Sequence, residues 1–217
     1  MFGAQLASKI QFIAIAAIPM IFAITVHEVA HGWVARLFGD RTAQMMGRLT
    51  LNPIKHIDPM GTIVVPVTMV ILTGFMFGWA KPVPVNARNL RDPKRNMVGV
   101  ALAGPCANLL MALGWALIYH FARQGNLGQG DPAVFVVQMS QIGVFFNILL
   151  MVFNLLPVPP LDGARVLRGL VPETFGRQLD ALEQYGLIIV VGLLVLGLLS
   201  PVITVASRLT ALLGVPF

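Results

Sequence analysis

Charged residues and cysteines are both scarce in this chain of 217 residues. Only 11% of the residues are charged, against about 25% in an average soluble domain, while 57% are hydrophobic and the mean hydropathy is +0.80. This composition excludes a disordered chain, an ordinary cytosolic enzyme and a nucleic-acid binder with a folded aqueous surface. The single cysteine, Cys106, excludes an internal disulfide and a cysteine-based zinc cluster. The sequence therefore predicts an integral membrane protein that contacts the lipid bilayer and binds no nucleic acid.

Long apolar runs make up much of the chain. A membrane-spanning helix needs about 20 mostly apolar residues, and five stretches qualify or nearly qualify: residues 10–38, 60–79, 96–122, 133–156 and 185–206. The first run is too long for a cleaved signal peptide. The sequence thus predicts an all-α polytopic membrane protein with five to six hydrophobic segments, which form a single membrane-embedded domain over residues 1–217.

Two polar connections contain residues that are typical of strands and turns. Residues 36–58 mix β-formers with Gly and Pro, and residues 77–86 alternate Pro with Val, which excludes a helix. We expect a small membrane-associated β element here. Its candidate edges are residues 41–51 and 78–85, which could hold a substrate segment extended by strand addition.

An HExxH motif, His27-Glu28-Val29-Ala30-His31, lies near the end of the first apolar run. On a helix, two histidines four residues apart share a face, so both imidazoles can bind one metal ion. Glu28 projects close by and can accept a proton from an attacking water. Three ionisable groups in five positions are costly inside a membrane and indicate a function. The alternative is a helix end at which these side chains simply meet the lipid headgroups.

A catalytic zinc site normally has three protein ligands, so the two histidines need a partner. The candidates are His56, His120, Asp58, Asp162 and the remaining glutamates. Asp162 is favoured because it follows a long apolar run, where prolines end the helix and Gly163 lets a carboxylate turn inward. The alternative is an ordinary proline-rich loop. His56 and Asp58 are more simply residues of a surface loop held by hydrogen bonds.

Three motifs occur in a characteristic order: HExxH at residues 27–31, GPxxN at residues 104–108 and NLLPVPPLDG at residues 154–163. Together they resemble the site-2 protease family of intramembrane zinc metalloproteases. The segments NPIKHIDPMGT and GWAKPVP, at residues 52–62 and 78–84, resemble the compact branch of that family, which has no PDZ or CBS domain.

The resemblance implies a metalloprotease that hydrolyses peptide bonds in or near transmembrane segments of membrane protein substrates. One zinc ion per chain would be held by His27, His31 and Asp162, with Glu28 as the general base. Asn154 matches a family position that orients the scissile peptide or stabilises its oxyanion.

A second asparagine, Asn108, matches a family position linked to substrate handling. Taken from the residues alone, Asn108 and Asn154 are amides inside apolar helices, where ordinary interhelical hydrogen bonds are the alternative role.

The proposed metal site constrains the topology. If residues 60–79 crossed the membrane fully, His31 and Asp162 would lie on opposite sides. The conflict disappears if residues 60–87 form a re-entrant stretch that returns to the same side. That arrangement also gathers most of the Lys and Arg residues on one side, as the positive-inside rule requires. We therefore expect a multi-pass protein of the cell membrane with its active site nearer the cytoplasmic face.

Two other functions stay open at this point. A membrane metal transporter would use the histidines and the aspartate as a transit site, but it needs polar groups along a path and leaves Glu28 without a role. A proteolytically silent homologue would bind and shield membrane proteins. The complete HExxH and LDG motifs argue against it.

Overall fold

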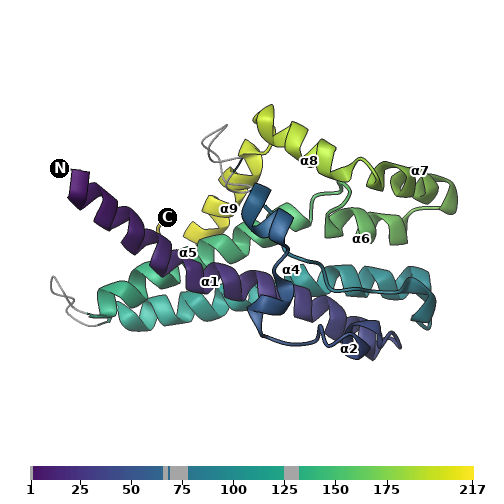
Figure 1. The fold of residues 1–217 in the computed structure, drawn as a ribbon, viewed down its shortest axis with the longest axis horizontal. Coiled ribbons are helices and arrows are strands. Elements are labelled where there is room, and N and C mark those ends of the chain that lie inside the picture. Colours follow the sequence, from purple (N-terminus) through teal and green to yellow (C-terminus); the bar gives the residue numbers. More distant parts are fainter. Residues whose placement is uncertain (1, 66–67, 69–77, 125–131) are drawn as a thin grey trace.

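Three long helices form the framework of the molecule (Figure 1). The computed structural model describes residues 2–65, 68, 78–124 and 132–217. The three helices are α1 (Phe2–Leu37), α4 (Pro93–Ala122) and α5 (Pro132–Asn154), and each of them packs against the other two. All three contain an apolar stretch long enough to span a membrane, and the shortest, with 23 residues, is about 35 Å long at 1.5 Å per residue. The predicted all-α fold is confirmed, and these three helices are compatible with a membrane protein.

Four shorter helices follow α5: α6 (Asp162–Leu170), α7 (Glu173–Glu183), α8 (Gly186–Val195) and α9 (Ser200–Leu212). The predicted segment 185–206 is not one helix, because it is interrupted between α8 and α9. Gly197 adopts a φ of 71° there, and Pro201 lies in the first turn of α9. In the part of the chain that is described, three helices could span a membrane, or four if α7 and α8, bent by 73°, count as one span. Five to six spanning segments are not confirmed.

The predicted β element is not confirmed either, since the described residues contain no strand. Part of the first candidate edge forms the helix α2 (Thr42–Met45), whose start is fixed by the Asp40 carboxylate, which accepts from the Thr42 amide at 3.0 Å. The second candidate edge has no regular secondary structure. Pro82 and Pro84 have no N–H group, so this segment lacks alternate donors that a strand ladder needs.

The described ends of the stretch 60–87 lie side by side. The Trp79 amide donates to the Gly61 carbonyl at 3.0 Å, next to the start of η2 (Pro59–Val64). The Thr62 hydroxyl donates to the Trp79 carbonyl at 3.0 Å. Residues 66–67 and 69–77 of the predicted re-entrant stretch lie outside the described residues. Residue 79 therefore lies beside residues 61 and 62.

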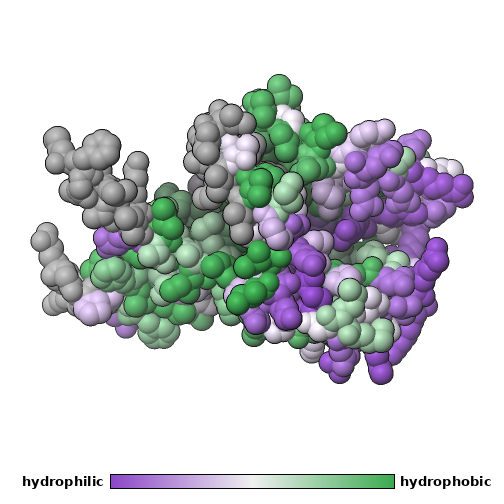
Figure 2. Space-filling view, viewed as in Figure 1, coloured by the Kyte–Doolittle hydropathy of each residue, from purple (hydrophilic) through white to green (hydrophobic). Residues whose placement is uncertain are grey.

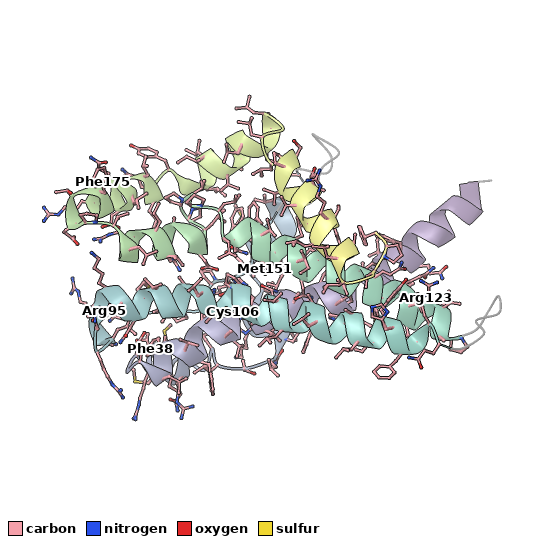
Figure 3. The ribbon with its side chains drawn as sticks, turned by 180° about the vertical axis from the view of Figure 1, so that it is seen from behind. Phe38, Arg95, Cys106, Arg123, Met151 and Phe175 are labelled. Carbon is pink, nitrogen blue, oxygen red and sulfur yellow. The ribbon has the colours of Figure 1, made fainter. Side chains whose placement is uncertain are left out.

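Hydrophilic side chains gather at one end of the long axis, which we call the polar end. It comprises α2, η3 (Ala87–Asn89), α6, α7 and the start of α4 (Figure 2). The end of α1 meets the start of α4 here, because the Arg91 amide donates to the Phe38 carbonyl at 3.1 Å. Figure 3 shows Arg95 at this end and Arg123, just after α4, at the opposite end. The chain therefore leaves α1 and enters α4 at the same end.

Small residues allow the central helices to approach one another closely. Ala112 and Ala116 of α4 pack with Val144 and Ile148 of α5, and Ala206 of α9 completes the cluster. Close backbone approach through small side chains is the usual way in which membrane helices pack. This packing fixes α4 between α1 and α5, directly behind the histidines of α1.

Candidate metal centre

Two histidines of α1 and the first residue of α6 converge in the interior. The Nε2 atoms of His27 and His31 are 3.0 Å apart, and the Asp162 Oδ2 atom lies 3.2 Å from each of them. All three side chains are buried. Among the described residues, His27, His31 and Asp162 form a group whose ligand atoms all lie within 4.8 Å of one another, close enough to hold one metal ion.

The three ligand atoms fit a zinc ion. Zinc bonds of about 2.0–2.1 Å in a tetrahedral arrangement separate neighbouring ligand atoms by about 3.3 Å, close to the distances of 3.0 and 3.2 Å found here. The Asp162 Oδ2 atom is buried and receives no hydrogen bond. An ionised carboxylate without a donor is suited to a cation.

The other ring nitrogens of the two histidines have fixed partners. His27 Nδ1 donates to the Asn108 Oδ1 atom at 2.6 Å, and His31 Nδ1 donates to the Val100 carbonyl at 2.7 Å. A protonated Nδ1 on a neutral ring leaves Nε2 with a free lone pair. Partners of this kind orient metal-binding histidines and set their tautomer. The two imidazoles are thus arranged to bind a metal through Nε2.

Two glycines allow the backbone to approach this cluster. A Cβ atom at Gly104 of α4 would lie 2.6 Å from His27 Nε2 and would also overlap His31 Nε2. A Cβ atom at Gly163 would overlap the carbonyl oxygens of Leu155 and Leu156. Both positions therefore require glycine: the first keeps the ligand atoms uncovered, and the second lets α6 begin against the end of α5.

Glu28 is partly exposed and is held by residues 81–83, which belong to the second half of the stretch 60–87. Its Oε2 atom accepts a hydrogen bond from the Val83 amide at 2.7 Å. The Val83 side chain packs onto α1 at Gly32, where a Cβ atom would lie 2.8 Å from Val83 Cγ1. Arg48, a buried side chain, donates from Nη2 to the Lys81 carbonyl at 2.9 Å. These contacts fix residues 81–83 beside the carboxylate.

A cavity of about 1240 Å³ opens onto the cluster. Its inner wall includes His27, Glu28, His31 and Asp162, and Asn154 lies on the same wall. Its outer wall is formed by charged residues of the polar end: Lys94, Arg165, Arg168, Glu173, Asp180 and Glu183. Arg168 binds both Asp180 and Glu173, at 2.9 and 2.8 Å. The cavity connects buried ligand atoms with a hydrophilic surface, so that water can reach them.

The remaining predicted site residues have different surroundings. Asn154 donates to the Leu150 carbonyl of its own helix at 3.0 Å and faces the cavity. Asn108 is completely buried behind His27. His56 donates to the Thr50 carbonyl, and Asp58 accepts from the Trp79 indole and from the Met60 amide.

His120, a further candidate ligand, contacts the Leu213 carbonyl at 2.8 Å. The candidate ligands His56, Asp58 and His120 are therefore not part of the metal cluster.

Three contributors to the site were not found from the sequence. Asn147 on α5 binds Asn108 at 2.9 Å, the Val83 amide binds Glu28, and the Val100 carbonyl binds His31. Asn147 could have been found from the sequence, since it is an amide in an apolar helix like Asn108 and Asn154. The two backbone groups could not have been found in this way, because almost any residue supplies an N–H and a carbonyl.

The chemistry of this arrangement follows from its parts. Two imidazoles and a carboxylate can hold a divalent ion with one position left for water or substrate. A fourth group, Glu28, lies beside them in the same cavity and can exchange a proton. This combination is suited to the hydrolysis of an amide bond.

Comparison with known proteins agrees with this chemistry. The profile of peptidase family M50 matches residues 129–198. YwhC of Bacillus subtilis (strain 168), whose name includes the words "zinc metalloprotease", is 42% identical over 173 residues, which are 79% of this chain and 76% of YwhC. No solved structure matches the chain at a significant level.

Two Rip2 proteins, whose names also include "zinc metalloprotease", are similar as well. Rip2 of Mycolicibacterium smegmatis is 36% identical over 81% of this chain and 64% of its own length. Rip2 of Mycobacterium tuberculosis is 31% identical over 77% of this chain and 61% of its own length. This chain thus spans less than two thirds of either Rip2 protein.

Proposed function

Because the chain belongs to peptidase family M50, the family of the site-2 proteases, we propose that it hydrolyses peptide bonds in or near transmembrane segments of membrane protein substrates. It is an integral membrane protein and a zinc metalloprotease. The observation that carries the proposal is the cluster of His27, His31 and Asp162, which is buried among helices long enough to span a membrane.

The polar side chains next to the metal cluster each have a role in this reaction. When bound by His27, His31 and Asp162, zinc supplies Lewis-acid activation of the scissile carbonyl and of water. Glu28 accepts the proton of the attacking water and passes it to the leaving amine, and the Val83 amide keeps its carboxylate oriented. Asn154 faces the same cavity and contacts the peptide next to the scissile bond.

The extended residues 78–85 run along the cavity and hold the substrate segment in an extended form. A helical substrate hides its scissile carbonyl in its own hydrogen bonds, so it must unwind before hydrolysis. Seven residues of this segment, Gly78 to Ala80 and Pro82 to Val85, line the cavity. This assignment is supported by position, since the same segment also contacts Glu28.

A multi-pass arrangement in the cell membrane accounts for the distribution of charge. The polar end, with its basic side chains, faces the cytoplasm, and residues 60–87 form a re-entrant stretch within the bilayer. The side-by-side position of Gly61 and Trp79 supports this arrangement. Water then reaches the metal ligands through the cavity from the cytoplasmic side.

The test separates the proposed zinc ligand Asp162 from the proposed general base Glu28, with Asp58→Asn as the matched control for Asp162→Asn. Purified protein should contain about one zinc per chain, Asp162→Asn should lose it, and Asp58→Asn should keep it, because Asp58 lies outside the cluster. Glu28→Gln should keep zinc and lose cleavage of single-span substrates by about 10²–10⁴-fold. Full zinc in Asp162→Asn, or wild-type cleavage by Glu28→Gln, would contradict the proposal. A zinc-loaded wild type that cleaves no substrate would favour the membrane-protein-binding alternative.

A further inference from the structure

Three buried polar side chains from three different helices form one chain of hydrogen bonds. His27 of α1 donates from Nδ1 to Asn108 Oδ1 of α4 at 2.6 Å. Asn108 Nδ2 donates to Asn147 Oδ1 of α5 at 2.9 Å, and Asn147 Nδ2 donates to the Gly143 carbonyl at 2.8 Å. Both asparagines are completely buried. This chain of hydrogen bonds therefore links His27, a proposed metal ligand, to the backbone of α5, and all of its side chains are buried.

The Gly143 carbonyl, the last acceptor in this chain of hydrogen bonds, fixes which atom donates in each of them. A backbone carbonyl can only accept, so the Asn147 atom facing Gly143 must be the NH₂ group. The Asn147 oxygen then faces Asn108, which must donate to it from its own NH₂ group. The Ala23 carbonyl, 3.4 Å from Asn108 Nδ2, requires the same orientation. The Asn108 oxygen is left facing His27, and it can only accept the Nδ1 proton.

His27 could instead carry its proton on the other ring nitrogen, Nε2. Its Nε2 atom lies 3.2 Å from the Asp162 carboxylate, so a proton on Nε2 could bind there instead. In that tautomer the lone pair of Nε2 is lost, and Nδ1 would face the Asn108 oxygen with no proton between them. The amide chain opposes this state, because two acceptors would then stand 2.6 Å apart in the interior.

We propose that Asn147, acting through Asn108, is a positioning residue that keeps the His27 proton on Nδ1 and leaves Nε2 free for zinc. The inference rests on the proposed metal site, but not on the protease reaction. It also assigns Asn108 a role behind His27 in place of substrate handling, since Asn108 is completely buried and does not line the cavity. His31 needs no such device, because a backbone carbonyl already fixes its Nδ1 atom.

The variants are chosen to break the chain at different links. Asn108→Leu removes the acceptor of His27. Asn147→Ser is a mild change, because a serine at this position can donate to its own helix as Ser140 does to the Val136 carbonyl, but is too short to reach Asn108. Ser140→Ala is the matched control, since Ser140 is completely buried in the same helix and is not part of the chain.

Two measurements on the full-length protein in detergent test the inference. The first is the apparent zinc affinity from competition with a chelator, where Asn108→Leu should weaken binding by about 10- to 100-fold. Asn147→Ser should weaken it by a smaller factor, and Ser140→Ala should stay close to the wild type. The Asn108→Leu/Asn147→Ser double variant should be no weaker than Asn108→Leu alone, because the chain is already broken.

The second measurement needs no metal. In zinc-free protein labelled with ¹⁵N-histidine, at a pH where the imidazoles are neutral, His27 should carry its proton on Nδ1 in the wild type. It should show the Nε2 tautomer in Asn108→Leu, and a mixture of both in Asn147→Ser. An unchanged tautomer in both variants, or multiplied losses of zinc affinity in the double variant, would overturn the inference. Neither readout depends on proteolysis, so a failure of the proposed protease function is seen separately in the Glu28→Gln test.

Discussion

At the scale of single residues, the absence of one side chain is as important as the ligands themselves. Gly104 lies against both imidazoles, and a Cβ atom there would be 2.6 Å from His27 Nε2. Gly104→Ala should therefore displace at least one imidazole and lower both zinc content and cleavage by at least about tenfold. The measurement is zinc per purified chain together with cleavage of a single-span substrate.

A second glycine of α4 provides the control for this change. Gly114 lies in the same helix, and a Cβ atom there would meet nothing within 4 Å. Gly114→Ala should keep zinc and activity and should stabilise α4 slightly, by about 0.5–1 kcal/mol. Equal zinc content in Gly104→Ala and Gly114→Ala would show that the close approach of α4 does not shape the metal site.

The sequence predicted the side chains of this site better than their supports. The i, i+4 spacing of His27 and His31 and the turn before Asp162 are local features, and the structure brings these three residues together. The bonds of Asn108 to His27 and to Asn147 join residues 81 and 39 positions apart. Such pairs depend on how α1, α4 and α5 pack, and hydrophobic periodicity gives no information about that packing.

At the scale of elements, the Arg48 side chain holds residues 81–83 beside the Glu28 carboxylate. Arg48 is buried and donates to the Lys81 and Pro82 carbonyls at 2.9 and 3.4 Å. These two residues directly precede Val83, whose amide binds Glu28. Arg48→Met should loosen this segment while leaving the metal ligands untouched. A bond from a charged donor contributes about 1.5–3 kcal/mol, so we expect cleavage to fall by about tenfold or more with zinc content unchanged.

Arg41 supplies the matched control for Arg48. It is exposed in the same connection, and Arg41→Met removes the same charge from the polar end. Cleavage by Arg41→Met should stay within about twofold of the wild type, since exposed charges contribute little. If both variants lose activity equally, the loss is an effect of charge, and the anchoring role of Arg48 is wrong.

A buried carboxylate joins three elements at the polar end. Asp40 follows α1 and accepts from the Thr42 amide of α2, from the Asn86 amide before η3 and from the Asn89 side chain. Burial opposes its ionisation, but the hydrogen bonds from Thr42, Asn89 and Asn86 outweigh this and lower the pKa of Asp40 below 3.8. Because the folded state holds the charged form more strongly, Asp40 stabilises the fold at neutral pH.

Asp40→Asn should therefore lower the stability at neutral pH by about 2 kcal/mol, as expected for bonds to a charged acceptor. The difference from the wild type should persist down to an unfolded pKa near 3.8 and shrink as the pH falls below it. Thermal unfolding in detergent at pH 7 and pH 3 measures both. Asp92→Asn is the control, since Asp92 is the exposed N-cap of α4 and asparagine caps equally well; an equal loss there would contradict the role of Asp40.

The extents of the elements were predicted where a helix is long and uninterrupted. The predicted segments 96–122 and 133–156 agree closely with α4 and α5. The segment 185–206 is just as apolar, but the turn at Gly197 divides it. Periodicity does not reveal whether a glycine inside an apolar run adopts a positive φ, because that depends on the tertiary contacts around it.

At the scale of the whole molecule, the two ends differ in charge. Basic residues of the polar end include Arg36, Arg41, Arg88, Arg91, Lys94, Arg95, Arg165, Arg168 and Arg177, whereas Arg123 lies at the opposite end. Since basic residues are retained on the cytoplasmic side, this asymmetry predicts that the polar end faces the cytoplasm. It also predicts that water enters the cavity from that side, because charged residues of the polar end line the cavity.

The orientation can be measured with two exposed arginines at opposite ends of α4, Arg95 and Arg123. Replacing Cys106 with serine removes the single native thiol, after which Arg95→Cys and Arg123→Cys each introduce one. In intact cells a membrane-impermeant thiol reagent should label Arg123→Cys, and it should label Arg95→Cys only after the membrane is permeabilised. The opposite pattern would place the cavity mouth outside the cell. Labelling of both cysteines from the same side would contradict a spanning α4, and with it the topology that lets His31 and Asp162 share one metal ion.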